Sequence, residues 1–158
     1  MPRKARTFKS RLTPDLQYNS LVVAKFINQI MLDGKKTLAA NIVYSSFENL
    51  QKVSQEKNVS ILDLFISIVE SVKPRVKMKS RRVGGATYQV PKPLEARESE
   101  MIAMKWIIDA ARSATGRTMI QALTSVFIET LEGRGTAIKK KEEMHKSAEA
   151  NKAFAHFA

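Results

Sequence analysis

Positively charged side chains recur at every second position in one short stretch of the chain. Arg75, Lys77, Lys79 and Arg81 alternate there with Val76, Met78 and Ser80. On a β-strand, alternate residues point to the same face at intervals of about 6.6 Å, so the four cations would form a row. Residues 73–82 hold six cations and no acid, and such a row repels itself unless an anion neutralises it. A polyphosphate backbone meets that requirement; the alternative is a solvated, lysine-rich edge hairpin that prevents aggregation.

A β-hairpin over residues 73–91 is the element that would position these cations. Pro74 marks the end of the preceding helix, because proline is excluded from helix interiors and drives Lys73 toward an extended backbone. Gly84-Gly85 permits the positive φ angles of a tight reversal. Residues 87–90 (TYQV) are good strand formers and supply the return strand, which Pro91 closes.

The chain offers no constellation of residues that we recognise as catalytic or metal-binding. Its two histidines, His145 and His156, are not in a metal-binding spacing, and it has no cysteine. Phosphate-binding glycine motifs and the G-x-S-x-G nucleophile motif are absent. Residues 33–36 (DGKK) look like a fragment of a phosphate loop but lack the preceding strand, so we interpret them as a turn between helices. The sequence therefore predicts a protein that is not an enzyme and that needs no cofactor or metal.

Composition limits the kinds of protein that this chain can be. Its 158 residues, 44% of them hydrophobic, are enough for one domain with a substantial core. The 27 Lys and Arg residues exceed the 15 Asp and Glu residues, and the net charge of +12 favours nucleic acid or an anionic membrane surface as partner. No apolar run reaches the roughly 18 residues of a membrane-spanning helix, and no signal peptide is recognisable. The lack of cysteine fits a reducing compartment.

A second basic segment lies at the start of the chain, in residues 1–14. It contains no acid and five cations, namely Arg3, Lys4, Arg6, Lys9 and Arg11. It also lacks apolar periodicity, which predicts a flexible arm that a partner could order. We interpret it as a phosphate-binding tail, and a solubilising terminus is the alternative.

Apolar residues at helical spacing predict three helices before the hairpin, within residues 15–72. The first follows Ser20, the second runs over residues 36–54, and the third runs from a capping Ser60 to residue 72. Leu38 and Phe47 are placed on the inner face of the second helix, and residues 55–59 form a polar connection.

Up to three more helices are predicted after the hairpin, within residues 93–151. Pro93 suits the first turn of one, Trp106 is interpreted as core packing, and Thr136 can cap the last. Residues 152–158 are predicted to form a tail. The expected fold is therefore a mainly α, single-domain bundle of five to six helices, with one β-hairpin protruding between the third and the fourth.

Several sequence blocks together resemble the small-subunit ribosomal protein S seven family, of bacterial or organellar type. They are KFIN at residues 25–28, DGKK at 33–36, VYS at 43–45, KSRRVGGATYQVP at 79–91, AMKW at 103–106, GTA at 135–137 and AEANKAFAH at 148–156. The block at 79–91 and the block at 148–156 are specific, and the match spans essentially the whole chain.

The resemblance implies a non-catalytic protein of the head of the small ribosomal subunit. Such a protein would bind a multi-helix junction in the 3′ major domain of small-subunit rRNA early in assembly, before neighbouring head and platform proteins add. Its hairpin would lie near the mRNA path and the exit-site tRNA. The resemblance implies a location on ribosomes of the bacterial cytoplasm or of an organelle, and the sequence does not decide between them. Neither a membrane nor a small-molecule substrate is implied.

Carried over position by position, the resemblance also implies which cations contact rRNA. They are Arg3, Lys4, Arg6, Lys9, Lys35, Lys36, Arg75, Lys77, Lys79, Arg81, Arg82, Arg112, Lys139, Lys140 and Lys141, with Gly84 and Gly85 as the hairpin turn. The chain departs from the family pattern after Pro91, where Glu95, Glu98 and Glu100 stand in a segment that is usually rich in arginine. It departs again after Arg112, where Ser113-Ala114 replaces a basic pair.

A DNA-binding architectural protein is the main alternative from the residues alone. A basic hairpin on a helical body is typical of some minor-groove benders, and Asp33-Gly34 could be the turn of a helix-turn-helix. Such hairpins carry an apolar wedge at the tip, and Val83 beside two glycines is a poor one. An RNA-processing enzyme is a third hypothesis, but the sequence offers no candidate general acid, general base or metal ligands for it.

Overall fold

The computed structural model describes residues 12–157, and within them the chain is mainly helical with one two-stranded antiparallel sheet. Its elements are α1 (Leu21–Ile30), α2 (Lys36–Asn49), α3 (Gln51–Lys57), α4 (Ile61–Val72), β1 (Val76–Val83), β2 (Ala86–Pro93), α5 (Ala96–Arg112), α6 (Met119–Leu131), α7 (Thr136–Ala150) and the short 3-10 helix η1 (Lys152–Phe157). None of the helices in this part of the chain is both long and apolar enough to cross a bilayer.

The predicted fold class is confirmed. That the whole chain acts as one domain stays a prediction.

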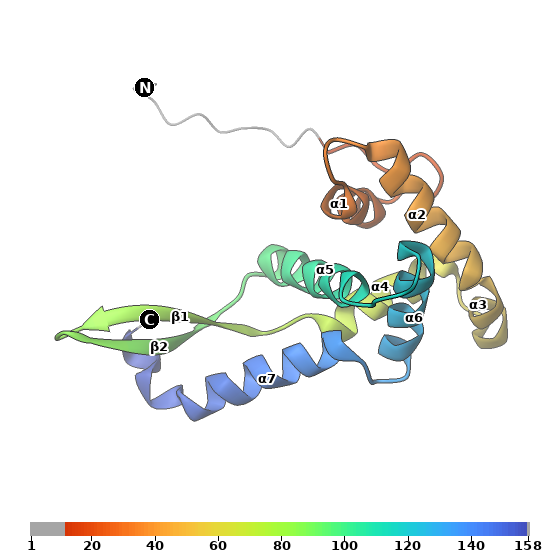
Figure 1. Ribbon diagram of the computed structural model, residues 1–158. Helices are drawn as coiled ribbons and strands as arrows, with labels where there is room; N and C mark the ends of the chain where they lie inside the picture. The colour runs from red at the N-terminus through yellow and green to blue at the C-terminus, as the bar shows by residue number, and fades with distance from the viewer. Residues whose placement is uncertain (1–11, 158) are drawn as a thin grey trace, which may run out of the picture.

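The molecule has two parts that are visible in Figure 1. Helices α1 to α6 pack into a bundle, and β1, β2, α7 and η1 extend together from one side of it. We call these four elements the arm. Helix α7 runs along β1, and η1 turns back onto β2, where the rings of Tyr88 and Phe154 lie 4.9 Å apart between centroids. The arm is therefore a hairpin whose base and middle are supported by α7 and η1, while its tip protrudes beyond them (Figure 1).

Four phenylalanines, one from each of four helices, form the centre of the bundle. Phe26 of α1, Phe47 of α2, Phe65 of α4 and Phe127 of α6 are each 0–1% exposed. Their ring centroids lie between 5.0 and 6.1 Å apart in five contacts, within the range in which aromatic pairs stabilise a core. The apolar spacing in each helix brings these rings to one point, so the body that carries the arm is well packed.

The predicted second helix is two helices in the structure. Helix α2 ends at Asn49 and α3 occupies Gln51–Lys57, so the expected polar connection at 55–59 is partly helical. Leu50 lies between them with φ −82° and ψ −7°, and its N–H donates to the carbonyls of Ser46 and Phe47. Because Leu50 is buried and stays close to helical geometry, the apolar spacing continues across the break and does not reveal it. The hairpin consequently lies between the fourth and fifth helices.

Several helix boundaries and faces also differ from the prediction. Leu38 is exposed, and Ala39, one position later, is buried in its place. Pro93 ends β2 opposite Val76 instead of opening a helix, because the Leu94 N–H donates to the Arg75 carbonyl and continues the pairing for one more residue. The strand therefore runs past Pro91. Half-buried Trp106 packs against the core as predicted.

Two helix starts illustrate how local geometry decides the boundaries. Ser60 caps α4 as predicted, accepting the Asp63 N–H at 3.1 Å. The cap of α7 is Gly135 and not Thr136, which is the first helical residue. Gly135 has φ 103°, and a Cβ there would lie 2.9 Å from Oε2 of Glu129, so no other residue fits this turn without strain.

The buried carboxylate of Asp15 ties the segment before α1 to α2. Its Oδ2 accepts the N–H groups of Gln17 and Tyr18 at 3.2 and 3.1 Å, and its Oδ1 accepts the Tyr44 hydroxyl at 2.5 Å. Burial, and then this hydrogen bond, raise the pKa of Tyr44 to about 12 from its ordinary value of 10.0.

We predict that this tyrosine makes the stability of the protein depend on alkaline pH. The folded chain holds the Tyr44 proton more tightly than the unfolded chain, so the stabilisation is complete below pH 10 and is lost as pH rises toward about 12. At pH 9, Tyr44→Phe should lower the free energy of unfolding by about 1.5–3 kcal/mol, the range for a hydrogen bond to a charged group. Between pH 9 and 11.5 the difference should shrink, and a constant difference in urea denaturation would contradict this prediction.

Candidate nucleic-acid interface

The hairpin presents cations on both of its faces. Residues that pair directly across an antiparallel sheet point to the same side, and the register pairs Lys77 with Lys92, Lys79 with Val90 and Arg81 with Tyr88. Lys77, Lys79 and Arg81 therefore share a face, as predicted from their alternation. Arg82 is on the opposite face, across from Thr87. Arg75 lies in a bend before β1, so the row on the strand itself has three cations and not four.

The two faces of the hairpin differ in their surroundings. Lys79, Arg81 and Arg82 are all exposed. The face of Lys79 and Arg81 also carries buried Val90 and half-buried Tyr88 from β2, and Tyr88 contacts Phe154 of η1. The turn is formed by Gly84 and Gly85 with φ 58° and 88°. Lys79, Arg81 and Arg82 thus lie exposed on the part of the hairpin nearest its turn.

Two acids of α5 form ion pairs with cations, one at the base of the arm and one on α1. Glu98 forms an ion pair with Lys77, and Glu100 pairs with Lys25 of α1 through Oε2 at 2.9 Å. The sequence does not predict these two partners, since nothing in the spacing of the acids points to residues 21 and 75 positions away. Their role in the structure is to fasten α5 to the hairpin and to α1. Lys77 is correspondingly less available to an external anion than Lys79.

Lys35 and Lys36 lie at the start of α2, far from the arm in Figure 1. Both are exposed, the helix has no acid in its first turn, and no side chain caps its first N–H groups. A helix start of this kind carries a partial positive charge that adds to that of the lysines. The preceding residues, Asp33 and Gly34, have φ 53° and 72° and form the tight turn that the sequence predicted.

Two further candidate cations also hold the fold together. The Lys141 ammonium donates to the Ser71 carbonyl in the last turn of α4, and Arg112 Nη2 donates to the Ile30 carbonyl, the last residue of α1, at 3.2 Å. Both bonds satisfy carbonyls at helix ends. Lys139 is exposed and Lys140 half-buried on α7.

The structure thus separates the predicted site into two clusters. One, the arm cluster, consists of the cations of β1 with those of α7, which lie side by side. The other, the turn cluster, consists of Lys35, Lys36 and Arg112, and Lys35 and Arg112 line one groove. Arg3, Lys4, Arg6 and Lys9 lie outside the described residues.

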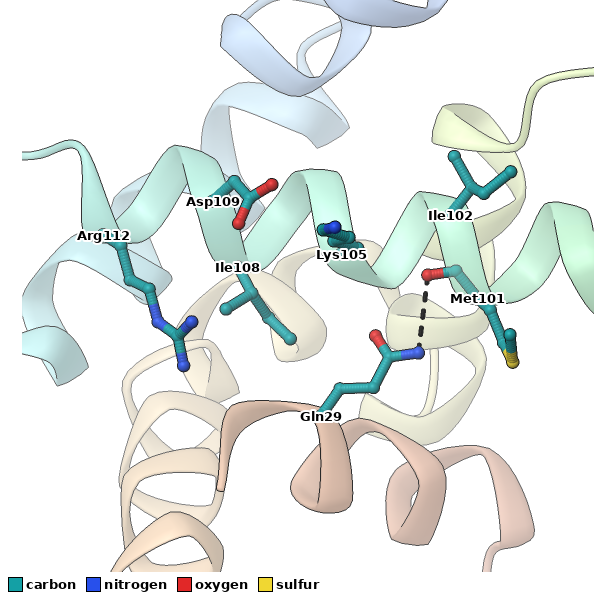
Figure 2. A pocket seen from close by; sticks show the side chains of 7 residues that line it. All are labelled: Gln29, Met101, Ile102, Lys105, Ile108, Asp109 and Arg112. Carbon is teal, nitrogen blue, oxygen red and sulfur yellow. Dashed lines mark hydrogen bonds between the residues drawn. The ribbon is translucent and has the colours of Figure 1, made fainter. Parts of the chain in front are cut away.

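A second groove, which Arg112 also lines, lies between α1 and α5 (Figure 2). It has a volume of about 300 Å³, and Lys105, Asp109 and Arg112 are its charged residues. Gln29 points across it from α1, and its Nε2 donates to the Met101 carbonyl at 3.4 Å. No group of three or more His, Cys, Asp or Glu side chains that could hold a metal ion occurs in residues 12–157.

His145 of α7 joins the helix to the root of the hairpin, a contact that the sequence did not predict. Its Nε2 accepts the Arg75 N–H at 3.0 Å. Burial lowers the pKa of His145 below its ordinary value of 6.5, and the nearby charges of Lys141 and Arg75 lower it further.

We predict that mild acid weakens this junction. The unfolded chain takes up the histidine proton near pH 6.5 while the folded chain resists it, so the stabilisation is present above pH 6.5 and is lost as pH falls. The free energy of unfolding of the wild type should therefore fall between pH 7.5 and 5.5 relative to that of His145→Gln. His156→Gln, which alters the other histidine of the chain, is the matched control that shows whether the effect belongs to His145. Parallel pH profiles for the wild type and His145→Gln would contradict the prediction.

Comparison with known proteins gives a consistent result over nearly the whole chain. The family model described as "Ribosomal protein S7p/S5e" matches residues 2–152. The "Small ribosomal subunit protein uS7" of Francisella tularensis subsp. holarctica (strain OSU18) is 48% identical over 157 residues, which cover 99% of both chains. The protein of the same name from Nautilia profundicola is 48% identical over 155 residues, 98% of both chains.

Proposed function

Because the chain belongs to the ribosomal protein S7p/S5e family and is a structural constituent of the small ribosomal subunit, we propose that it binds the 3′ major domain of the subunit rRNA and nucleates assembly of the head. Its partners are rRNA and other ribosomal proteins. The observation that supports the proposal best is the pair of cation clusters, one on the arm and one at the α1–α2 turn, held apart by a well-packed bundle. Two cation clusters held apart by the packed bundle suit an RNA junction, in which phosphates of different helices occupy fixed positions.

The proposed mechanism is recognition of RNA by shape and by contacts to phosphates. A-form helices hide their base edges in a deep and narrow groove, so a protein recognises a junction largely by the layout of its backbones. The arm cluster would contact one part of the junction with Lys79, Arg81 and Arg82, and the turn cluster would contact another with Lys35 and Lys36. We further propose that the hairpin tip lies near the mRNA path and the exit-site tRNA. The ribosome concerned is that of a bacterial cytoplasm or of an organelle.

The test is the salt dependence of binding to a transcript of the 3′ major domain. If about eight phosphates are neutralised, the logarithm of the association constant should fall with the logarithm of salt concentration at a slope near −6. A slope shallower than about −2 would refute the mechanism. Duplex DNA of equal length is the competitor: equal affinity for both would favour the DNA-binding alternative.

A further inference from the structure

An apolar groove opens beside the α1–α2 turn, and two leucines of its wall are left uncovered by the fold. Leu32 is 61% exposed and Leu38 is 57% exposed. Ile42 of α2 and Met119 of α6 continue the apolar lining, and the groove has a volume of about 410 Å³. This volume is at the lower end of the range for sites that take small ligands. Exposed apolar surface beside such a groove, on a bundle that is otherwise well packed, indicates a binding surface.

The rim of the groove is charged, with an excess of cations. Lys35 and Arg112 line it together with a single acid, Asp33, and Lys36 follows directly in the chain. Arg112 donates one hydrogen bond to the Ile30 carbonyl, and a guanidinium has five N–H donors, so donors remain for an incoming anion. The occupant that fits is apolar in the middle and anionic at its edge.

We propose that this groove holds one unpaired base of the rRNA, with the adjoining phosphates on Lys35 and Arg112. The inference rests on the rRNA binding proposed above and specifies what the turn cluster recognises. A base that is turned out of a helix has apolar faces and a charged backbone, and proteins commonly read RNA sequence at such bases. The carboxylate of Asp33 can accept a hydrogen bond from the exocyclic amine of adenine, cytosine or guanine, which uracil lacks. An acidic protein helix fits less well, because it would need a longer groove for anchors at successive turns.

The test compares two variants of the groove in binding to the 3′ major-domain transcript. Leu38→Gln keeps the size and the neutral charge of the side chain but removes apolar surface that a bound base would bury, so affinity should fall about 5- to 30-fold with no change in salt slope. Lys35→Ala removes one phosphate contact, so the slope should become shallower by about 0.7–0.9. Leu16→Gln, at a fully exposed leucine outside the groove, is the matched control and should bind like the wild type. Because Leu38 is exposed, its replacement should leave thermal unfolding of the protein unchanged.

Chemical probing of the RNA with dimethyl sulfate supplies the second measurement. The wild type should protect one unpaired adenine, cytosine or, when kethoxal is used as the probe, guanine, and this base should become reactive again with Leu38→Gln. If Leu38→Gln binds as the wild type does while Lys35→Ala is weakened, rRNA binding stands and the base site is refuted. If Leu38→Gln binds the transcript normally but blocks the addition of another ribosomal protein, the occupant is a protein and the base site is again refuted. Failure of the wild type itself to bind the transcript would overturn the proposed function.

Discussion

Replacing Lys79, Arg81 and Arg82 together by alanine is expected to weaken binding to the 3′ major-domain transcript by roughly 100-fold at 0.1 M salt. Each lost phosphate contact removes about 0.7–0.9 from the salt slope, so three together should make it shallower by about 2 or more. The three side chains are exposed on the part of the hairpin nearest its turn. Filter binding at four or more salt concentrations gives both the affinity and the slope.

A matched control separates loss of charge from damage to the hairpin. Gln89 Nε2 donates to Ser80 Oγ at 2.9 Å across the two strands. Replacing both by alanine removes this cross-strand bond and leaves every charge in place. That double variant should retain the wild-type slope. If the triple variant also retains it, the arm cluster does not contact phosphates and the proposed role of the hairpin fails.

Replacing Phe127 by alanine should have the largest effect on stability, about 3–5 kcal/mol off the free energy of unfolding. The side chain is fully buried, and its ring lies 6.0, 6.1 and 5.9 Å from those of Phe26, Phe47 and Phe65. The substitution would leave a cavity where four helices meet. Since small domains are stable by about 5–15 kcal/mol, this loss is a large share of the total.

Urea denaturation checks this expectation: the midpoint of the unfolding transition should fall, while the dependence of the unfolding free energy on urea concentration stays the same. Phe127→Leu, which keeps most of the volume, should cost far less, about 1.5 kcal/mol or below. A loss below about 1 kcal/mol for the alanine variant would show that the four rings do not form the centre of the core.

The fold class could be predicted from the sequence because two different periodicities report it. Apolar residues at helical spacing mark the helices, and the alternation around Lys77 and Lys79, followed by Gly84-Gly85, marks the hairpin. The helix break and the helix face that were predicted wrongly have no signal in the neighbouring sequence. Leu50 continues the apolar spacing through the break between α2 and α3, and the exposure of Leu38 depends on how α2 is rotated against its neighbours.

The candidate site was predicted only in part, for a related reason. Composition and spacing identify which residues are cationic, but the partner of each cation is set by tertiary structure. Lys77 next to Glu98, Lys141 under the end of α4 and Arg112 at the end of α1 are contacts between residues 21 to 82 positions apart. The groove with Leu32 and Leu38 in its wall was missed because the helical pattern placed Leu38 inside.

The contact between Tyr88 and Phe154 joins two segments that are synthesised at different times. Synthesis proceeds from the amino end, so the hairpin leaves the exit tunnel while α7 and η1 are still to be made. Both strands are therefore made before Phe154, and the contact of β2 with η1 can form only after the hairpin itself has been synthesised.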